Sequence, residues 1–117
     1  MFSIVKIKTV HVYTAWNEHA KECWDVMKLL QDNGIPYTHM NYLDDEQMNK
    51  VIESLNTWTF SDDGENRFQK TFIKFPIVHW EAVNDNDDKY MNVAEGLEEL
   101  QNSQLIQLKE KVVNRVV

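Results

Sequence analysis

Apolar residues in the first third of the chain follow two successive patterns. Residues 4–13 are rich in Val and Ile without helical periodicity, which predicts a β-strand buried on at least one face. From Asn17 onward the pattern becomes helical, and Asn17 would cap the helix while Asn33-Gly34 would end it. The apolar positions of this helix recur every three or four residues: Ala20, Cys23, Trp24, Met27 and Leu30.

A second strand and a second helix follow. Residues 37–43 are short and contain aromatic side chains after a turn, so they predict a strand parallel to the first. Asp44 with Gln47 resembles a capping box, and a helix over residues 45–56 should follow. That helix carries one apolar stripe: Met48, Val51, Ile52 and Leu55.

The next part of the chain predicts a loop and a β-hairpin. Residues 61–67 are polar and turn-forming, which favours an exposed loop. Residues 72–80 are strongly apolar apart from Lys74 and Pro76, so we expect a strand with the proline at its start or edge. A turn at residues 84–88 and a short strand at 89–91 complete the hairpin.

The C-terminal part predicts further helix. Asn92 with Glu95 resembles a capping box, which places a third helix from there to Asn102. Apolar residues between positions 105 and 116 recur at roughly helical spacing and predict a helical extension. The chain therefore reads as an α/β domain of order β-α-β-α-β-β-α. We expect one domain over residues 1–117, with a core at about 8–102 and an extension at 103–117.

Length and composition limit the class of protein. A chain of 117 residues has room for one stable core, and its 43% hydrophobic and 26% charged residues are typical of a soluble globular protein. No apolar run is long enough to cross a bilayer, so we expect no membrane partner. Lys6 and Lys8 interrupt the first apolar run, which argues against a secretory signal. The expected location is the cytoplasm.

Charge and cysteine content narrow the possible partners. The formal net charge of -7 opposes binding to a phosphate backbone, so we expect no nucleic acid partner. Cys23 is the only cysteine, and it cannot form a disulfide within the chain. Any redox chemistry would have to be monothiol or intermolecular.

A proline at the start of the hairpin points to a known family. The run Lys74-Phe75-Pro76-Ile77-Val78, followed by a hairpin and a helix, resembles the glutaredoxins, which have a thioredoxin fold. The resemblance implies a four-stranded mixed sheet with helices on both faces. It also implies that the Phe75-Pro76 bond is cis and lies against the active-site turn.

The active site of that family lies where the first strand meets the first helix, because the helix N-terminus stabilises a thiolate. Matched forward from the strand, Trp16-Asn17-Glu18-His19-Ala20-Lys21 overlays Trp-Cys-x-x-Cys-Lys, with Asn17 and Ala20 at the cysteine positions. Matched backward from Gly34, the two positions are Ala20 and Cys23. Both registers stay open, and neither places a cysteine at the nucleophile's position.

The glutathione pocket of the family uses a Gly-Gly-Asp type turn at the start of the last helix. The resemblance aligns Asn92-Val93-Ala94-Glu95 with that turn. Side chains there would hinder close backbone approach, and Glu95 would add negative charge near an anionic ligand. Glutathione binding is therefore doubtful, and we expect no other cofactor.

Cys23 and Trp16 each have two interpretations. Cys23 lies on the apolar stripe, which favours a buried core residue over a reactive thiol of low pKa. Trp16 would either form part of a binding surface or pack beneath residues 61–67.

His19 is four residues before Cys23, but a metal site would need distant ligands, so we expect no metal there. The distant candidates are His11, His39 and His79.

Three functions follow as hypotheses. The leading one is a glutaredoxin-like protein without dithiol chemistry, which binds a peptide or protein partner in a groove at the former active site. The second is a monothiol oxidoreductase that uses Cys23 with glutathione or a partner disulfide, so whether the chain is an enzyme is left open. The third is an assembly protein that oligomerises through residues 105–117. The small size and lost site would also suit a viral or accessory protein. The groove residues are Trp16, Asn17, Glu18, His19, Ala20, Phe75 and Pro76.

Overall fold

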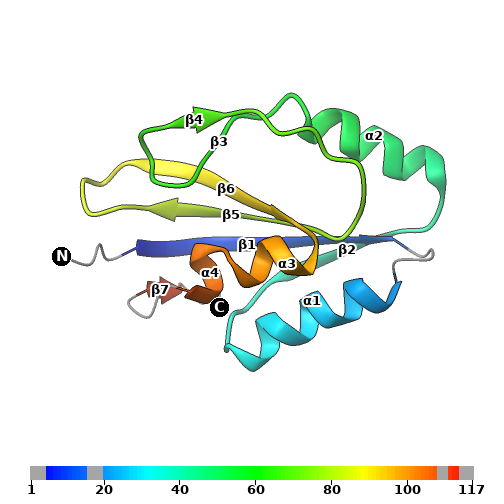
Figure 1. Cartoon of the computed structure of the whole chain (residues 1–117), viewed down its shortest axis with the longest axis horizontal. Helices are drawn as coiled ribbons and strands as arrows, with labels where there is room; N and C mark the ends of the chain where they lie inside the picture. The colour runs from blue at the N-terminus through cyan, green and yellow to red at the C-terminus, as the bar shows by residue number, and fades with distance from the viewer. Residues whose placement is uncertain (1–4, 16–19, 108–110, 114–117) are drawn as a thin grey trace.

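The molecule is built on one mixed β-sheet (Figure 1). The computed structural model describes residues 5–15, 20–107 and 111–113. The strand order is β2-β1-β5-β6, in which β1 (Val5–Ala15) pairs in parallel with β2 (Thr38–Tyr42). On its other edge β1 pairs antiparallel with β5 (Ile77–Val83), which forms a hairpin with β6 (Lys89–Glu95). This is the four-stranded arrangement that the sequence predicts.

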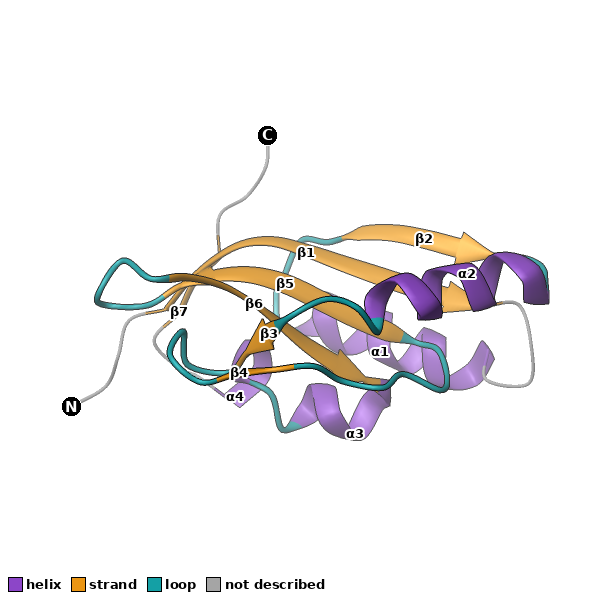
Figure 2. Cartoon of the chain, turned by 90° about the horizontal axis from the view of Figure 1, so that it is seen from above, coloured by secondary structure: helices purple, strands orange, loops and turns teal. Residues whose placement is uncertain are grey.

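Helices cover both faces of the sheet. Figure 1 shows α1 (Ala20–Asp32) and α3 (Gly96–Gln101) on one face, with the short helix α4 (Gln104–Gln107) beside them. The opposite face carries α2 (Asp45–Leu55), and the view from above in Figure 2 places α2 in front of the sheet and α1 and α3 behind it. None of the described helices has the length and apolar character needed to cross a membrane.

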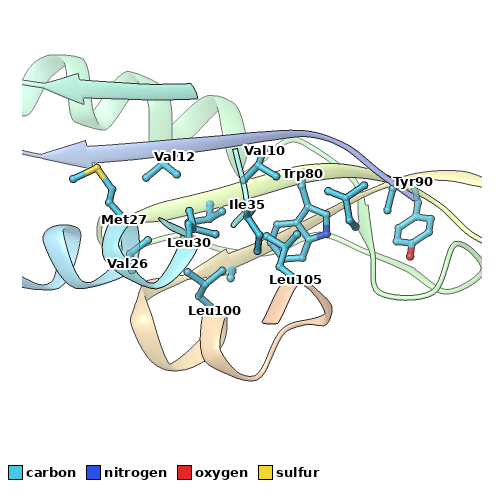
Figure 3. Packing of buried hydrophobic residues seen from close by; sticks show 14 residues of the cluster. Val10, Val12, Val26, Met27, Leu30, Ile35, Trp80, Tyr90, Leu100 and Leu105 are labelled. Carbon is cyan, nitrogen blue, oxygen red and sulfur yellow. The ribbon is translucent and has the colours of Figure 1, made fainter. Parts of the chain in front are cut away.

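Each face of the sheet has its own hydrophobic core. The larger core lies between the sheet and α1, α3 and α4, where Trp80 packs near Leu105 and Leu30 packs near Leu100 (Figure 3). The second core lies on the α2 face and also holds the residue before the hairpin proline, Phe75. The buried residues of the second core are Ala15, Leu55, Phe60, Phe72, Phe75, Ile77 and Val93.

Local signals in the sequence correctly place both ends of α2 and the C-terminal end of α1, while Asn17, the predicted cap of the first helix, lies outside the described residues. The side chain of Asp44 accepts a hydrogen bond from the backbone N–H of Gln47 at 2.8 Å, so Asp44 caps α2. Gly34 follows α1 with a φ of +67°, a left-handed conformation that glycine adopts without strain. Trp24 is an exception, because its side chain is 70% exposed although the helical pattern placed it on the buried stripe. The buried residues of α1 are Cys23, Val26, Met27 and Leu30, and Trp24 lies at the flank of that set.

The prediction of a helical C-terminal extension is wrong. Of residues 103–117, the structure describes 103–107 and 111–113, and these contain the four-residue α4 and then β7 (Lys111–Val113), which pairs in parallel with β1 as a fifth strand. β7 uses residues 5–7 of β1, whereas β2 pairs with residues 11–15 of the same strand. The β-branched Val112 and Val113 fit such a pairing better than a helix.

The predicted capping box at Asn92 and Glu95 is also wrong. Residues 89–95 all pair with β5, so both side chains belong to β6 and the third helix begins only at Gly96. Gly96 has a φ of +85°, which lets the chain turn from strand into helix without the strain that a side chain would bring. The turn at residues 84–88 is where the sequence predicts it, with the Asp87 N–H donating to the Asn84 carbonyl at 3.1 Å.

Residues 61–67 are mostly exposed, as their polarity predicts, but two of them are buried. They form the turn of a short hairpin between β3 (Phe60–Ser61) and β4 (Arg67–Phe68), and Ser61 and Gly64 are buried. The hydroxyl of Ser61 accepts a hydrogen bond from the Gly64 N–H at 2.9 Å, which satisfies a buried donor.

Candidate functional site

The described residues next to the predicted active-site turn include the end of β1 and the hairpin proline, which lie at one end of the sheet. The β1–β5 ladder reaches this end at the pair Tyr13 and Ile77, and Pro76 precedes Ile77 directly. The Phe75-Pro76 bond is cis, both residues are buried, and the Pro76 carbonyl accepts a hydrogen bond from the Gly96 N–H at 2.8 Å. The proline therefore joins the start of α3 to the end of β1.

Four of the predicted groove residues cannot be placed. Trp16, Asn17, Glu18 and His19 lie outside the described residues, so their place in the groove stays a prediction. Ala20 is the first described residue of α1, and its side chain is partly exposed.

Cys23 is buried in the first turn of α1. Its side chain is 4% exposed, and its thiol lies within hydrogen-bonding reach of the backbone of Ala15, at the end of β1. Burial raises the pKa of the Cys23 thiol and the charge of Glu22 adds to that rise, while the Ala15 contact opposes it. In the register that begins at Ala20, the resemblance gives this position to the second, buried cysteine, so the burial of Cys23 agrees with that register, which stays a prediction.

A carboxylate of the chain itself lies against the start of α3. The Glu22 Oε2 atom accepts a hydrogen bond from the Leu97 N–H at 3.1 Å and lies 3.6 Å from the Lys74 Nζ atom. A Cβ atom on Gly96 would come within 2.6 Å of the same oxygen. The strand-to-helix turn therefore requires a glycine at position 96. This glycine lies just after Asn92-Val93-Ala94-Glu95, the residues that the resemblance aligned with the family's turn.

Two glutamates hold the segment that leads to Pro76. The Glu95 Oε2 atom accepts hydrogen bonds from the backbone N–H groups of Ile73 at 2.7 Å and Lys74 at 3.1 Å. The Glu99 Oε1 atom accepts one from the Glu95 N–H at 2.9 Å and pairs with Lys70. Glu95 thus has a structural role different from the capping role that its spacing predicts. The Ile73 side chain is 78% exposed beside the proline segment.

A groove of about 950 Å³ opens beside these contacts, between α1 and α3. Its lining includes five carboxylates against two lysines, so the groove is acidic. We call it the α1–α3 groove. Its charged residues are Glu22, Asp25, Glu95, Glu98 and Glu99 together with Lys21 and Lys74.

The histidines considered as distant metal ligands make other contacts. His79 lies in the sheet with its Nε2 atom 2.9 Å from the Tyr13 hydroxyl and its Nδ1 atom 3.3 Å from the Met91 sulfur. Burial lowers the pKa of His79 to about 4, and the nearby His11 adds to the shift. His39 contacts the Thr14 hydroxyl at 2.6 Å. Within residues 5–15, 20–107 and 111–113, no three potential metal ligands of the His, Cys, Asp and Glu types come together.

No pattern in the sequence predicts the contact that Glu22 makes with the start of α3, or the close approach of Gly96 to it. Both depend on contacts between α1 and the start of α3, which are 75 residues apart in the case of Glu22 and Leu97. One local signal was available for Gly96, because a glycine between an apolar strand and the acidic run Glu98-Glu99 is typical of a strand-to-helix turn.

Comparison with solved structures supports the fold. The chain is similar to a crystal structure of glutaredoxin 1 from Francisella tularensis complexed with cacodylate, with a TM-score of 0.53 and 16% sequence identity. The similarity covers 84% of this chain and 90% of that chain. No family model and no curated protein matches the sequence. The chain therefore has a glutaredoxin-like, thioredoxin-type fold, and at this identity the likeness extends to the fold alone.

Proposed function

We propose that this protein is a glutaredoxin-like domain that lacks dithiol chemistry and binds a peptide or protein partner in the α1–α3 groove. This groove lies at the start of α3, and the predicted groove residues Ala20, Phe75 and Pro76 do not line it. The observation that carries the proposal is the burial of Cys23, the one cysteine of the chain, in the first turn of α1. The nucleophile's position then holds a methyl group, while the groove next to it stays open.

The state of Cys23 argues against monothiol catalysis. A thiol attacks a disulfide as the thiolate, and it must be accessible to its partner. Burial lowers access to Cys23 and raises its pKa, so both requirements are opposed by the same packing. The enzyme hypothesis would require α1 to move away from the end of β1.

The electrostatics of the groove argue against glutathione. Glu22 already accepts a hydrogen bond from the Leu97 N–H at the start of α3, the part of the fold where the resemblance places the glutathione pocket. The net negative lining would repel a ligand that carries two carboxylates of its own. A peptide or protein partner meets neither obstacle, because its binding does not need a carboxylate at that amide.

Assembly through residues 105–117 has less support. Leu105 is completely buried in the larger core, and residues 111–113 pair with β1 of the same chain. These described parts of the tail are engaged within the fold, so a second copy would have to displace them.

A peptide selection with a blocked groove tests the proposal. Peptides selected from a random display library against the native protein should bind it in solution by calorimetry. Lys21→Trp places a bulky side chain at a groove residue that is almost fully exposed, and it should weaken the selected peptides at least about tenfold. Lys50→Trp on the exposed face of α2 is the matched control and should leave binding unchanged.

Two results would count against the proposal. One is a set of peptides whose affinity is the same for both tryptophan variants, which would place their site elsewhere. The other is turnover of a glutathione mixed disulfide that is abolished by Cys23→Ser, which would establish the monothiol activity instead.

A further inference from the structure

A second groove lies on the other side of α3, between that helix and the β3–β4 hairpin. It encloses about 780 Å³ and borders the outer edge of β6, the last strand of the sheet order. It shares residues of the exposed face of α3 with the α1–α3 groove, but Asp62 and Asn92 line only this one. We call it the β6 groove.

The floor of the β6 groove contains a buried amide with an unused donor. Asn92 is 4% exposed, and its Oδ1 atom accepts a hydrogen bond from the Val93 N–H at 2.8 Å. Among the residues that the structure describes, its Nδ2 group donates to no protein acceptor. The Nδ2 atom is not among the side-chain atoms that are closed off from solvent, so it reaches the surface of the groove, where water or the acceptor of a ligand can satisfy it.

The edge of β6 is held by side chains rather than by a neighbouring strand. The N–H of Val93 bonds to the Asn92 side chain, and the N–H of Glu95 bonds to the Glu99 side chain. The side-chain amide of Asn92 therefore acts like a backbone peptide group of a neighbouring strand. Its carbonyl oxygen accepts from the N–H of Val93 in β6, and its N–H₂ group faces the groove. The natural acceptor for such a donor is the backbone carbonyl of an extended segment.

The rim of the β6 groove supplies negative charge. Asp62 and Glu98 line it with exposed side chains, and neither carboxylate accepts a hydrogen bond from a residue in the described ranges. Glu99 is already paired with Lys70, which is the one basic residue among the residues lining this groove. A ligand that enters here thus meets two unneutralised carboxylates above one amide donor.

We infer that the β6 groove is a binding site for an extended basic segment of a partner protein. A backbone carbonyl of that segment accepts from the Asn92 Nδ2 group, and a lysine or arginine side chain lies between Asp62 and Glu98. Glu98 lines both grooves, but Asp62 and Asn92 line only this one, so the site does not depend on the proposed function.

A titration with a defined peptide tests the site. The probe is a fluorescein-labelled octapeptide of alternating lysine and threonine, with the glutamate and threonine octapeptide of equal length as its comparison, both at low salt. Asp62→Asn should weaken the lysine peptide about two- to fivefold, which is typical of one exposed charge pair. Asn92→Leu should weaken it about two- to tenfold, as expected for one neutral hydrogen bond. Asp85→Asn removes the same charge in the β5–β6 turn and should have little effect.

The side-chain amide of Asn92 gives a readout that does not need a folded variant. In ¹⁵N-labelled native protein its N–H₂ resonances should shift on addition of the lysine peptide and stay in place with spermidine, which is cationic but has no carbonyl. The inference is overturned if those resonances do not move while the peptide binds. It is equally overturned if spermidine moves them as far, or if Asp85→Asn weakens binding as much as Asp62→Asn does.

Discussion

Replacing Ala20 with cysteine should restore a redox-active pair to this chain. The structure places Ala20 at the first described position of α1 and Cys23 one turn later, buried at the end of β1. Residues three apart on a helix have Cβ atoms about 5 to 6 Å apart, close enough for a disulfide after a small adjustment. The variant Ala20→Cys should therefore form an intramolecular disulfide with Cys23.

The size of the effect follows from the helix. An N-terminal dipole stabilises a negative charge by about 0.3 to 1 kcal/mol, which favours the thiolate of the new cysteine about two- to fivefold. Closing a loop of four residues removes chain entropy worth about 2 kcal/mol from the unfolded state. The oxidised variant should therefore resist urea better than its reduced form.

Mass spectrometry after mild oxidation, with and without a thiol-blocking reagent, measures the bridge. Ala20→Ser controls for the added polar atom. Lys21→Cys is the sharper control, because residues two apart on a helix face different directions and cannot bridge to Cys23. It should react with the reagent as an exposed thiol while Cys23 stays unmodified.

The reasoning about the register fails if Ala20→Cys keeps both thiols free under conditions that oxidise small dithiols. It also fails if Lys21→Cys forms the intramolecular bridge instead. In either case Ala20 would not hold the nucleophile's position. The result would then favour the other register, in which Asn17 and Ala20 occupy the two cysteine positions.

Three further predictions concern stability, measured by urea unfolding. The pKa of His79 is lowered to about 4, so between about pH 6.5 and 4 the unfolded state binds a proton that the folded state does not. The free energy of unfolding should therefore fall by about 3 kcal/mol as the pH drops through that range. His79→Gln should lose less stability over the same range, and an equal loss would contradict the assignment to His79. Gly96→Ala should lower the free energy of unfolding by about 1 to 2 kcal/mol, because residue 96 has a positive φ and the new Cβ atom would approach Glu22. Adding Glu22→Ala should restore part of that loss, and full recovery would show that backbone strain is absent. Asp44→Ala should cost about 1 kcal/mol through loss of the cap, against little effect of Asp45→Ala, and equal costs would refute the capping role.

The sequence predicted well wherever structure follows from near neighbours. Asp44 and Gly34 mark helix boundaries through hydrogen bonds and backbone angles that involve only the adjoining turn. Cys23 is buried, as its place on the apolar stripe indicates. Such signals, together with the proline that starts the hairpin, predict the order of the six main elements β1, α1, β2, α2, β5 and β6.

The errors arose where distant pairing decided the outcome. Asn92 and Glu95 have the spacing of a capping box, but pairing with β5 extends the strand through both. Val112 fits the predicted helical repeat, yet residues 111–113 pair with residues 5–7 of β1 and so belong to the sheet. The contact of Glu22 with α3 depends on the same long-range packing, so no local pattern reports it.

The rate at which Cys23 reacts with a thiol reagent tests the central claim most directly. Measured at one pH in the native protein and in the urea-unfolded chain, the native rate should be at least about a hundredfold lower, because a buried, protonated thiol must wait for local opening. A native rate equal to or above the unfolded rate would mean that Cys23 is an accessible thiolate, and the account of a glutaredoxin-like fold without its nucleophile would be wrong.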